Sequence, residues 1–203
     1  MKHLLLLYSL LFYSAYSYSQ LPLDSADLDA FMDGQIETLM REIHINGVSV
    51  SVVKDQQIFW SKGYGWADEK NEVKVDPAAS LFRMGSISKT FVWTAVMQLY
   101  EVGKLDLDTD IRTYIDDFEI DDSYEGAITM KHLLSHSAGF EDYYIELFSN
   151  DTLPPTSLGE ELNTHNPKRV RPPAMHSSYS NHGTAMAAYI VEKVSGLSWD
   201  QYV

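Results

Sequence analysis

FRMGSISKTFVWTAVMQLYEVGKLDL, residues 82–107, contains the pattern on which the interpretation of this chain depends. Apolar spacing predicts a helix from about Ser86 to Val102, closed by Gly103. Residues three apart share a helix face, so Ser86 and Lys89 should point together. They are either a nucleophile and its base or a capping serine beside a surface lysine. The buried stripe of this helix is predicted to comprise Phe91, Ala95, Leu99 and Val102.

The same spacing occurs a second time, at Ser51 and Lys54. That pair lies on a predicted strand, where residues three apart face opposite sides. The pattern therefore arises by chance as well. Taken by itself, it favours a cap and a surface lysine over catalysis.

The elements around this helix predict the fold class. Residues 25–43 have the spacing of an amphipathic helix, and residues 48–60 alternate around a polar turn, which indicates a β-hairpin. Two strands alone are marginally stable, so they should belong to a larger sheet. Beyond Gly103 the pattern is helical. We expect an α/β fold of the α+β type: an antiparallel sheet flanked by helices, plus a helical region.

The helical region has several boundary signals. Thr129 is the predicted cap of a short helix, and residues 141–178 read as a long proline-rich loop with a helical piece near 157–162. A longer helix should cover about 182–195, and Ser198 with Gln201 predicts a capping box for the next one.

Composition limits the classes of protein. The chain has 203 residues, 45% of them hydrophobic, which suits one compact domain. A net charge of -14 repels phosphate backbones and argues against a nucleic-acid partner. With no cysteine, neither a disulfide nor a lipid anchor on cysteine is expected.

The first nineteen residues resemble an export signal: Lys2, a short apolar run, and small residues before Gln20. We expect a signal peptide over 1–19, with a retained N-terminal anchor as the alternative, and a periplasmic or secreted product. The apolar run is too short to span a bilayer, which takes about 20 apolar residues, so no transmembrane segment is expected.

Three other clusters have weaker interpretations. His132 and His136 share a helical face but lack further metal ligands at suitable spacing, so no metal is expected. Residues 106–110 begin like a calcium loop, yet Ile111 stands where glycine is required, which favours a polar turn. The basic run at 168–171 reads as a solvated loop, with a substrate-carboxylate contact as the alternative.

Tyr179-Ser180-Asn181 changes the weight of the Ser86 pattern. With KGYGWAD at 62–68, LFRMGSISKTF at 81–91, GKLDLDTDI at 103–111, ITMKHLLSHSAGF at 128–140 and YSNHG at 179–183, the chain resembles the serine β-lactamase and penicillin-binding-protein superfamily, specifically its class C-like branch. Linked blocks in family order are more specific than either short motif.

The resemblance implies roles for four residues. Ser86 would be the nucleophile that forms an acyl-enzyme, Lys89 the acceptor of its proton, and Tyr179 the phenol that shares this work and protonates the leaving group. Asn181 would hold the substrate amide and the lysine. A small-molecule or peptide substrate and no cofactor are implied. The alternative is a non-catalytic penicillin-binding or sensor protein on the same fold, or an inactive truncated chain.

Two departures from the family pattern affect these expectations. Pro173-Ala174 stands where the family usually has Pro-Gly. The third family motif, a strand that completes the oxyanion hole, is not found before Val203. We therefore expect residues 20–203 to be the N-terminal part of one domain, with the C-terminal strands missing and little activity on its own.

Overall fold

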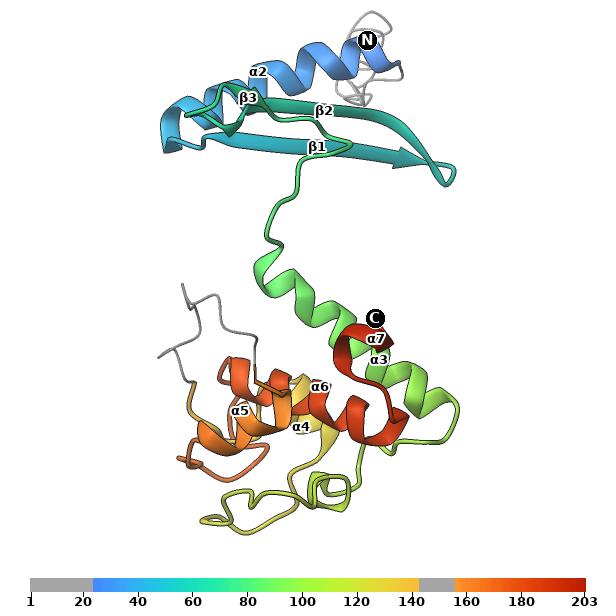
Figure 1. The fold of residues 1–203 in the computed structure, drawn as a ribbon, viewed down its shortest axis with the longest axis vertical. Coiled ribbons are helices and arrows are strands. Elements are labelled where there is room, and N and C mark those ends of the chain that lie inside the picture. Colours follow the sequence, from blue (N-terminus) through green and yellow to red (C-terminus); the bar gives the residue numbers. More distant parts are fainter. Residues whose placement is uncertain (1–23, 143–155) are drawn as a thin grey trace, which may run out of the picture. The chain divides into compact units, whose positions relative to one another are not determined.

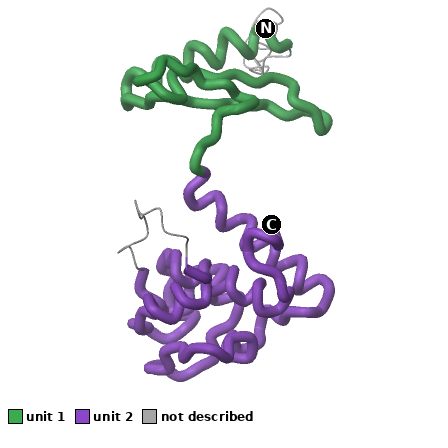
Figure 2. The backbone as a smooth tube through the Cα atoms, in the orientation of Figure 1, with its two compact units in different colours: residues 1–83 green, residues 84–203 purple. Residues whose placement is uncertain are grey.

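The computed structural model describes residues 24–142 and 156–203, which form two compact units (Figure 2). One unit ends at Arg83 and contains the sheet, and the other, Met84–Val203, is helical (Figure 1). The predicted mixture of helices and antiparallel sheet is confirmed. Among the described helices, none has the length and apolar content needed to cross a bilayer. The predicted signal peptide lies outside the described residues, and the assignment of 20–203 to one domain stays a prediction.

Helix α2 (Ser25–Ile43) has the predicted bounds. It begins where the Asp24 carboxylate accepts a hydrogen bond from the Asp27 N–H at 2.8 Å. It ends at His44, whose left-handed backbone (φ 56°) turns the chain toward the sheet.

Strands β1 (Gly47–Lys54) and β2 (Gln57–Asp68) form the predicted antiparallel hairpin. The connection is the dipeptide Asp55-Gln56, and both residues have positive φ (51° and 64°), as tight two-residue hairpin turns require. A short third strand, β3 (Val73–Lys74), pairs with β2 and was not predicted.

Apolar and charged contacts hold α2 on this sheet. Trp60 and Tyr64, four positions apart on one face of β2, are buried against the apolar side of the helix. Between them, the Lys62 ammonium lies 3.0 Å from carboxylate oxygens of both Asp29 and Asp33. Tyr64 donates a hydrogen bond to Asp33 (2.9 Å) and the Trp60 indole donates one to Asp29 (3.1 Å), so all three of these β2 side chains have a hydrogen-bond partner on α2.

The helix of the opening motif begins later than predicted. A 3₁₀ turn, η1 (Gly85–Ser88), precedes helix α3 (Lys89–Glu101). The predicted stripe is confirmed at two of its members and wrong at Phe91 and Val102, which are 49% and 67% exposed. Apolar residues run almost all round this helix, so sequence spacing alone did not select the buried face. Its buried residues are Val92, Ala95, Val96 and Leu99.

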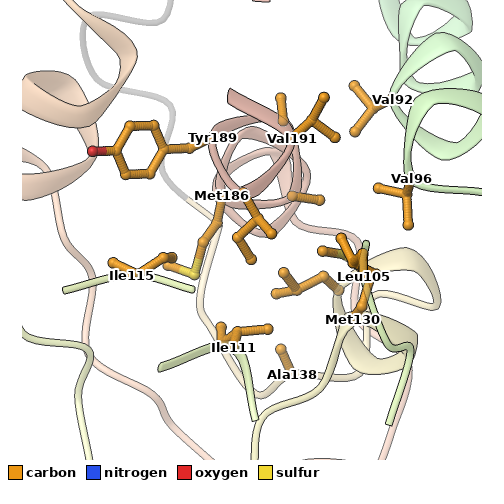
Figure 3. Packing of buried hydrophobic residues seen from close by; sticks show 14 of the residues in the cluster. Val92, Val96, Leu105, Ile111, Ile115, Met130, Ala138, Met186, Tyr189 and Val191 are labelled. Carbon is orange, nitrogen blue, oxygen red and sulfur yellow. The ribbon is translucent and has the colours of Figure 1, made fainter. Parts of the chain in front are cut away.

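Helix α6 (Asn181–Ser195) is the centre of the second unit. It contacts α3, α4 (Met130–Leu134), α5 (Leu158–Thr164) and α7 (Trp199–Tyr202). Figure 3 shows Met186 and Val191 of α6 in a cluster that also contains Val92 and Val96 of α3. This packing fixes the N-termini of α3 and α6, where the candidate residues lie.

One predicted N-cap is confirmed, one is wrong, and one further cap was not predicted. The predicted cap Thr129 accepts from the His132 N–H at the start of α4, and Ser157, which was not predicted as a cap, caps α5. Ser198 makes no side-chain cap hydrogen bond. Instead, the first N–H of α7 donates to the carboxylate of Glu192 at 2.6 Å, so an acid from α6 takes the place of the capping serine.

The interpretation of the basic run as a solvated loop is wrong at Arg169, which is 3% exposed. Its Nε donates to the Asp121 carbonyl oxygen (2.9 Å) and its Nη2 donates to the Tyr124 carbonyl oxygen (2.5 Å). Its backbone N–H donates to the Asp121 carboxylate (2.9 Å). Arg169 is therefore a structural anchor for the loop that leads to Tyr179.

Candidate active site

Ser86 and Lys89 face each other because of the 3₁₀ turn. Side chains three residues apart are eclipsed in a 3₁₀ helix, which has three residues per turn. Ser86 lies within η1 and Lys89 directly follows it, and the Lys89 Nζ is 3.3 Å from the Ser86 Oγ. The serine is exposed and the lysine is half-buried. The predicted pairing is thus present, on a tighter helix than expected.

Tyr179 completes a cluster of three groups around the same oxygen. Its hydroxyl donates a hydrogen bond to the Ser86 Oγ at 2.5 Å. The Lys89 Nζ also lies 4.8 Å from the centroid of the Tyr179 ring. The hydrogen bond with Lys89, and then that with Ser86, lowers the pKa of the Tyr179 phenol from its usual value. A serine oxygen with a phenol of lowered pKa and an amine beside it has the parts needed to lose a proton.

Asn181 connects the lysine to the start of α6. Its Oδ1 accepts a hydrogen bond from the Lys89 Nζ at 2.6 Å. On the other side its Nδ2 donates to the Asp142 carboxylate at 3.0 Å, and its backbone N–H donates to the same carboxylate at 2.7 Å. All four predicted site residues therefore lie in one hydrogen-bonded group.

His136 lies behind Tyr179. Its ring centroid is 4.7 Å from that of Tyr179, and its Nδ1 accepts from the Ser180 N–H at 3.3 Å. Its carbonyl oxygen accepts from the Ser178 N–H at 2.7 Å, so it contacts the chain on both sides of the tyrosine. Burial, assisted by the charge of Lys89, lowers the pKa of His136 and favours the neutral ring that this acceptor role requires.

The loop before Tyr179 contains an alanine, Ala174, with a backbone conformation that usually requires glycine. Ala174 has φ 64°, in the left-handed region, and its N–H donates to the Ser137 carbonyl oxygen at 2.9 Å. The departure from Pro-Gly therefore leaves the turn in place with a strained alanine.

The alternative patterns have structural explanations. Ser51, in the second S-x-x-K, lies on β1 and shares a hydrogen bond with Ser61 across the sheet (2.8 Å). His132 accepts from the Thr129 N–H through Nδ1. Asp106 accepts from the Asp108 N–H at 2.7 Å, which confirms the polar turn. The described residues contain no group of three or more histidine or acidic side chains suited to a metal ion.

Sequence reasoning missed two residues of this site, Asp142 and His136 as a neighbour of Tyr179. Asp142 stands 39 positions before Asn181, and His136 stands 44 before Ser180. No local spacing relates such positions. The only sequence signal for either residue was membership of the block at 128–140, which ends before Asp142.

Comparison with known sequences shows the family to which this chain belongs. The sequence model of the family described as Beta-lactamase matches residues 32–203. The putative penicillin-binding protein PbpX of Bacillus subtilis is 31% identical over 169 residues, which are 83% of this chain and 40% of that protein. The human mitochondrial serine β-lactamase-like protein LACTB is 37% identical over 105 residues, half of this chain and 19% of that protein.

Solved structures give the same result for the fold. The octameric penicillin-binding protein homologue from Pyrococcus abyssi has a TM-score of 0.73 and 29% identity, over 89% of this chain and 41% of that one. A class C β-lactamase has a TM-score of 0.71 and 26% identity, over 90% of this chain and 48% of that one. The chain thus spans less than half the length of each of these relatives.

Proposed function

The chain belongs to the β-lactamase family, and from this premise we propose that the whole protein is an exported serine hydrolase that acts through an acyl-enzyme on Ser86. One observation carries the proposal. The Ser86 Oγ receives hydrogen bonds from both the Tyr179 hydroxyl (2.5 Å) and the Lys89 Nζ (3.3 Å).

In the proposed acylation, the Ser86 oxygen attacks a carbonyl carbon of an amide, ester or β-lactam. Tyr179, ionised to the phenolate beside the Lys89 ammonium, accepts the serine proton: the phenol oxygen has the shorter contact with Ser86, and its lowered pKa favours the phenolate. The backbone N–H of Ser86 is our proposed donor to the oxyanion.

The proposed second half releases the leaving group and then the acyl group. The proton taken from Ser86 passes from Tyr179 to the leaving nitrogen or oxygen as the bond between that atom and the carbonyl carbon breaks. Water then attacks the ester on Ser86, and the serine recovers its proton as the carboxylic acid departs. Asn181 accepts a hydrogen bond from Lys89 through its Oδ1, and our proposal gives it the further role of contacting the substrate amide.

The similar proteins support only a broad class of substrate. Penicillin-binding proteins and class C β-lactamases are among the similar proteins, so a D-alanyl peptide, a β-lactam or a related ester is the substrate class that we propose. The second candidate is a sensor that is acylated and does not turn over. It requires the same Ser86 cluster and differs only in the fate of the acyl group.

Covalent labelling tests the nucleophile. The full-length protein is incubated with a fluorophosphonate or β-lactam probe, and the modified peptide is located by mass spectrometry. We expect one adduct, on Ser86, that disappears in Ser86→Ala. Ser51→Ala is the matched control, because it removes the serine of the other S-x-x-K pattern, and it should label normally. Labelling that survives Ser86→Ala would refute the proposal.

Repeated turnover separates the two candidates. For a hydrolase, wild-type protein should hydrolyse at least one of a β-lactam, a D-alanyl peptide and an ester over many turnovers. For a sensor, none of the three should be turned over, and the β-lactam adduct on Ser86 should persist. Lys89→Ala should slow labelling by at least about 100-fold, because Tyr179 loses the cation that favours its basic phenolate form, whereas Lys54→Ala should not.

A further inference from the structure

Asp142 is bonded to Asn181 by two separate hydrogen bonds. One carboxylate oxygen accepts from the Asn181 backbone N–H (2.7 Å) and the other accepts from the Asn181 Nδ2 (3.0 Å). Asn181 in turn accepts from the Lys89 Nζ at 2.6 Å, and that nitrogen is 3.3 Å from the Ser86 Oγ. A continuous series of polar contacts therefore runs from Asp142 to the nucleophile.

The donors and acceptors in this series permit one orientation of the Asn181 amide. A primary amide has a donor side and an acceptor side, a carboxylate only accepts, and an ammonium only donates. With Nδ2 toward Asp142 and Oδ1 toward Lys89, both contacts are favourable. If the amide were flipped, it would place oxygen against a carboxylate and NH₂ against an ammonium.

We propose that Asp142 is a positioning residue that fixes the orientation of the Asn181 amide and thereby holds the Lys89 Nζ beside Ser86. The inference rests on the proposed function, since it adds a residue to the same site. Asp142 acts through Asn181, and no bond to Ser86 or Tyr179 is involved.

A simpler role for Asp142 would be to cap helix α6. An acid near a helix N-terminus is stabilising, and Asp142 does accept from the first N–H of α6. That helix already has a capping residue, however: the Ser180 Oγ accepts from the Gly183 N–H at 3.0 Å. The hydrogen bond from Asn181 Nδ2 contributes nothing to capping, because its donor is a side-chain amide and not a backbone N–H of the helix.

Replacement of Asp142 by asparagine separates the two roles. Asparagine caps helices about as well as aspartate, so Asp142→Asn should be harmless if capping is the only role. If orientation is the role, the new amide offers one acceptor oxygen where the carboxylate offered two to the Asn181 backbone N–H and Nδ2, so the Asn181 amide is no longer held with Oδ1 toward Lys89. Asp142→Asn should then slow Ser86 labelling at least 10-fold, as much as Asp142→Ala does. Asp24→Asn, at the cap of α2, is the matched control and should have no effect on labelling.

A second measurement does not depend on catalysis. In the double variant Asp142→Asn/Asn181→Asp, the polarity of the pair is reversed: the new amide at position 142 can donate to one oxygen of the new carboxylate at position 181, and Lys89 can donate to the other. We expect the Tm lost in Asp142→Asn to be recovered by about half or more in the double variant, which is the non-additivity of directly bonded residues.

Each outcome decides one of the two claims. If wild-type protein labels at Ser86 and Asp142→Asn labels equally fast, the positioning role is wrong and the proposed function stands. If wild-type protein does not label, the proposed function fails and the Tm values alone decide: recovery in the double variant supports the orientation by Asp142, and additive losses overturn it.

Discussion

Removal of His182 should make the folded protein less sensitive to acid. His182 is the second residue of α6 and is 7% exposed. Its Nε2 is buried with no hydrogen-bond partner among the described residues, and its ring lies against Phe140 at a centroid distance of 5.2 Å. Because burial disfavours the charged imidazolium, the pKa of His182 falls from 6.5 to about 4.

The magnitude follows from the two pKa values. Above pH 6.5 the histidine is neutral in both states and contributes no pH dependence. As the pH falls from 6.5 toward 4, the unfolded chain binds a proton that the folded chain does not, so the free energy of unfolding decreases by about 1.4 kcal/mol per pH unit. The loss reaches about 3 kcal/mol by pH 4 and is about 2 kcal/mol between pH 7 and pH 5.

Urea unfolding of wild-type protein and His182→Leu at pH 7 and pH 5 measures this term. Subtracting the pH dependence of the variant from that of the wild type cancels the contributions of other groups that titrate in this range. It also cancels any effect of the substitution on packing that does not change with pH. The variant should lose about 2 kcal/mol less stability than the wild type between the two pH values. His176→Leu, which removes an exposed histidine, is the control for loss of one imidazole. If the wild type and His182→Leu lose stability in parallel, the buried neutral histidine is not the cause.

Three further results are expected. Ala174→Gly removes the strain of a left-handed alanine and should raise the free energy of unfolding by about 0.5–1 kcal/mol. Ala127 is exposed and has no left-handed backbone, so Ala127→Gly should lower the free energy of unfolding by a similar amount, and a loss of stability in both variants would contradict this. Arg169→Lys leaves two carbonyl oxygens without their guanidinium donors and should lower the free energy of unfolding, measured with denaturant, by about 2–4 kcal/mol. Lys168 is exposed, so Lys168→Ala should lower it by under about 0.5 kcal/mol, and equally small losses in both variants would refute an anchoring role for Arg169. In ultraviolet titration, the difference between wild type and Tyr179→Phe should show one phenol that ionises below the ordinary tyrosine value, and a midpoint at or above that value would be evidence against the contact with Lys89.

Local patterns were sufficient to predict most of the secondary structure. Helix α2 and the β1–β2 hairpin have clean periodicity on one face, and the structure follows it. The stripe of α3 was mispredicted because FVWTAV offers apolar residues on adjacent faces, and only the packing against α6 selects Val92 over Phe91. The capping box at Ser198 failed for a related reason, since a tertiary partner, Glu192, caps that helix instead.

The site residues that belong to short sequence motifs were predicted, and those that meet these motifs only through long-range contacts were missed. Ser86 and Lys89 are one turn apart, and Tyr179 and Asn181 are two residues apart, so short patterns contain them. Asp142 and His136 meet the second motif only after α4 and α6 pack together, which they do through long-range contacts. Similarly, the buried side chain of Arg169 could not be distinguished from its charged neighbours in the sequence.

Two residues near the site have a left-handed backbone that their side chains disfavour, His136 (φ 57°) and Ala174 (φ 64°). Such conformations cost about 1–3 kcal/mol each and persist only where the surroundings over-determine them. Here the Ala174 N–H donates to the Ser137 carbonyl oxygen and the Ser178 N–H donates to that of His136, so the loop before Tyr179 is held at two points. Because the second point remains in Ala174→Gly, that variant should gain stability with no change in the ionisation of Tyr179. A shift of the phenol titration in Ala174→Gly would show that the strained alanine, and not His136, determines where the tyrosine lies.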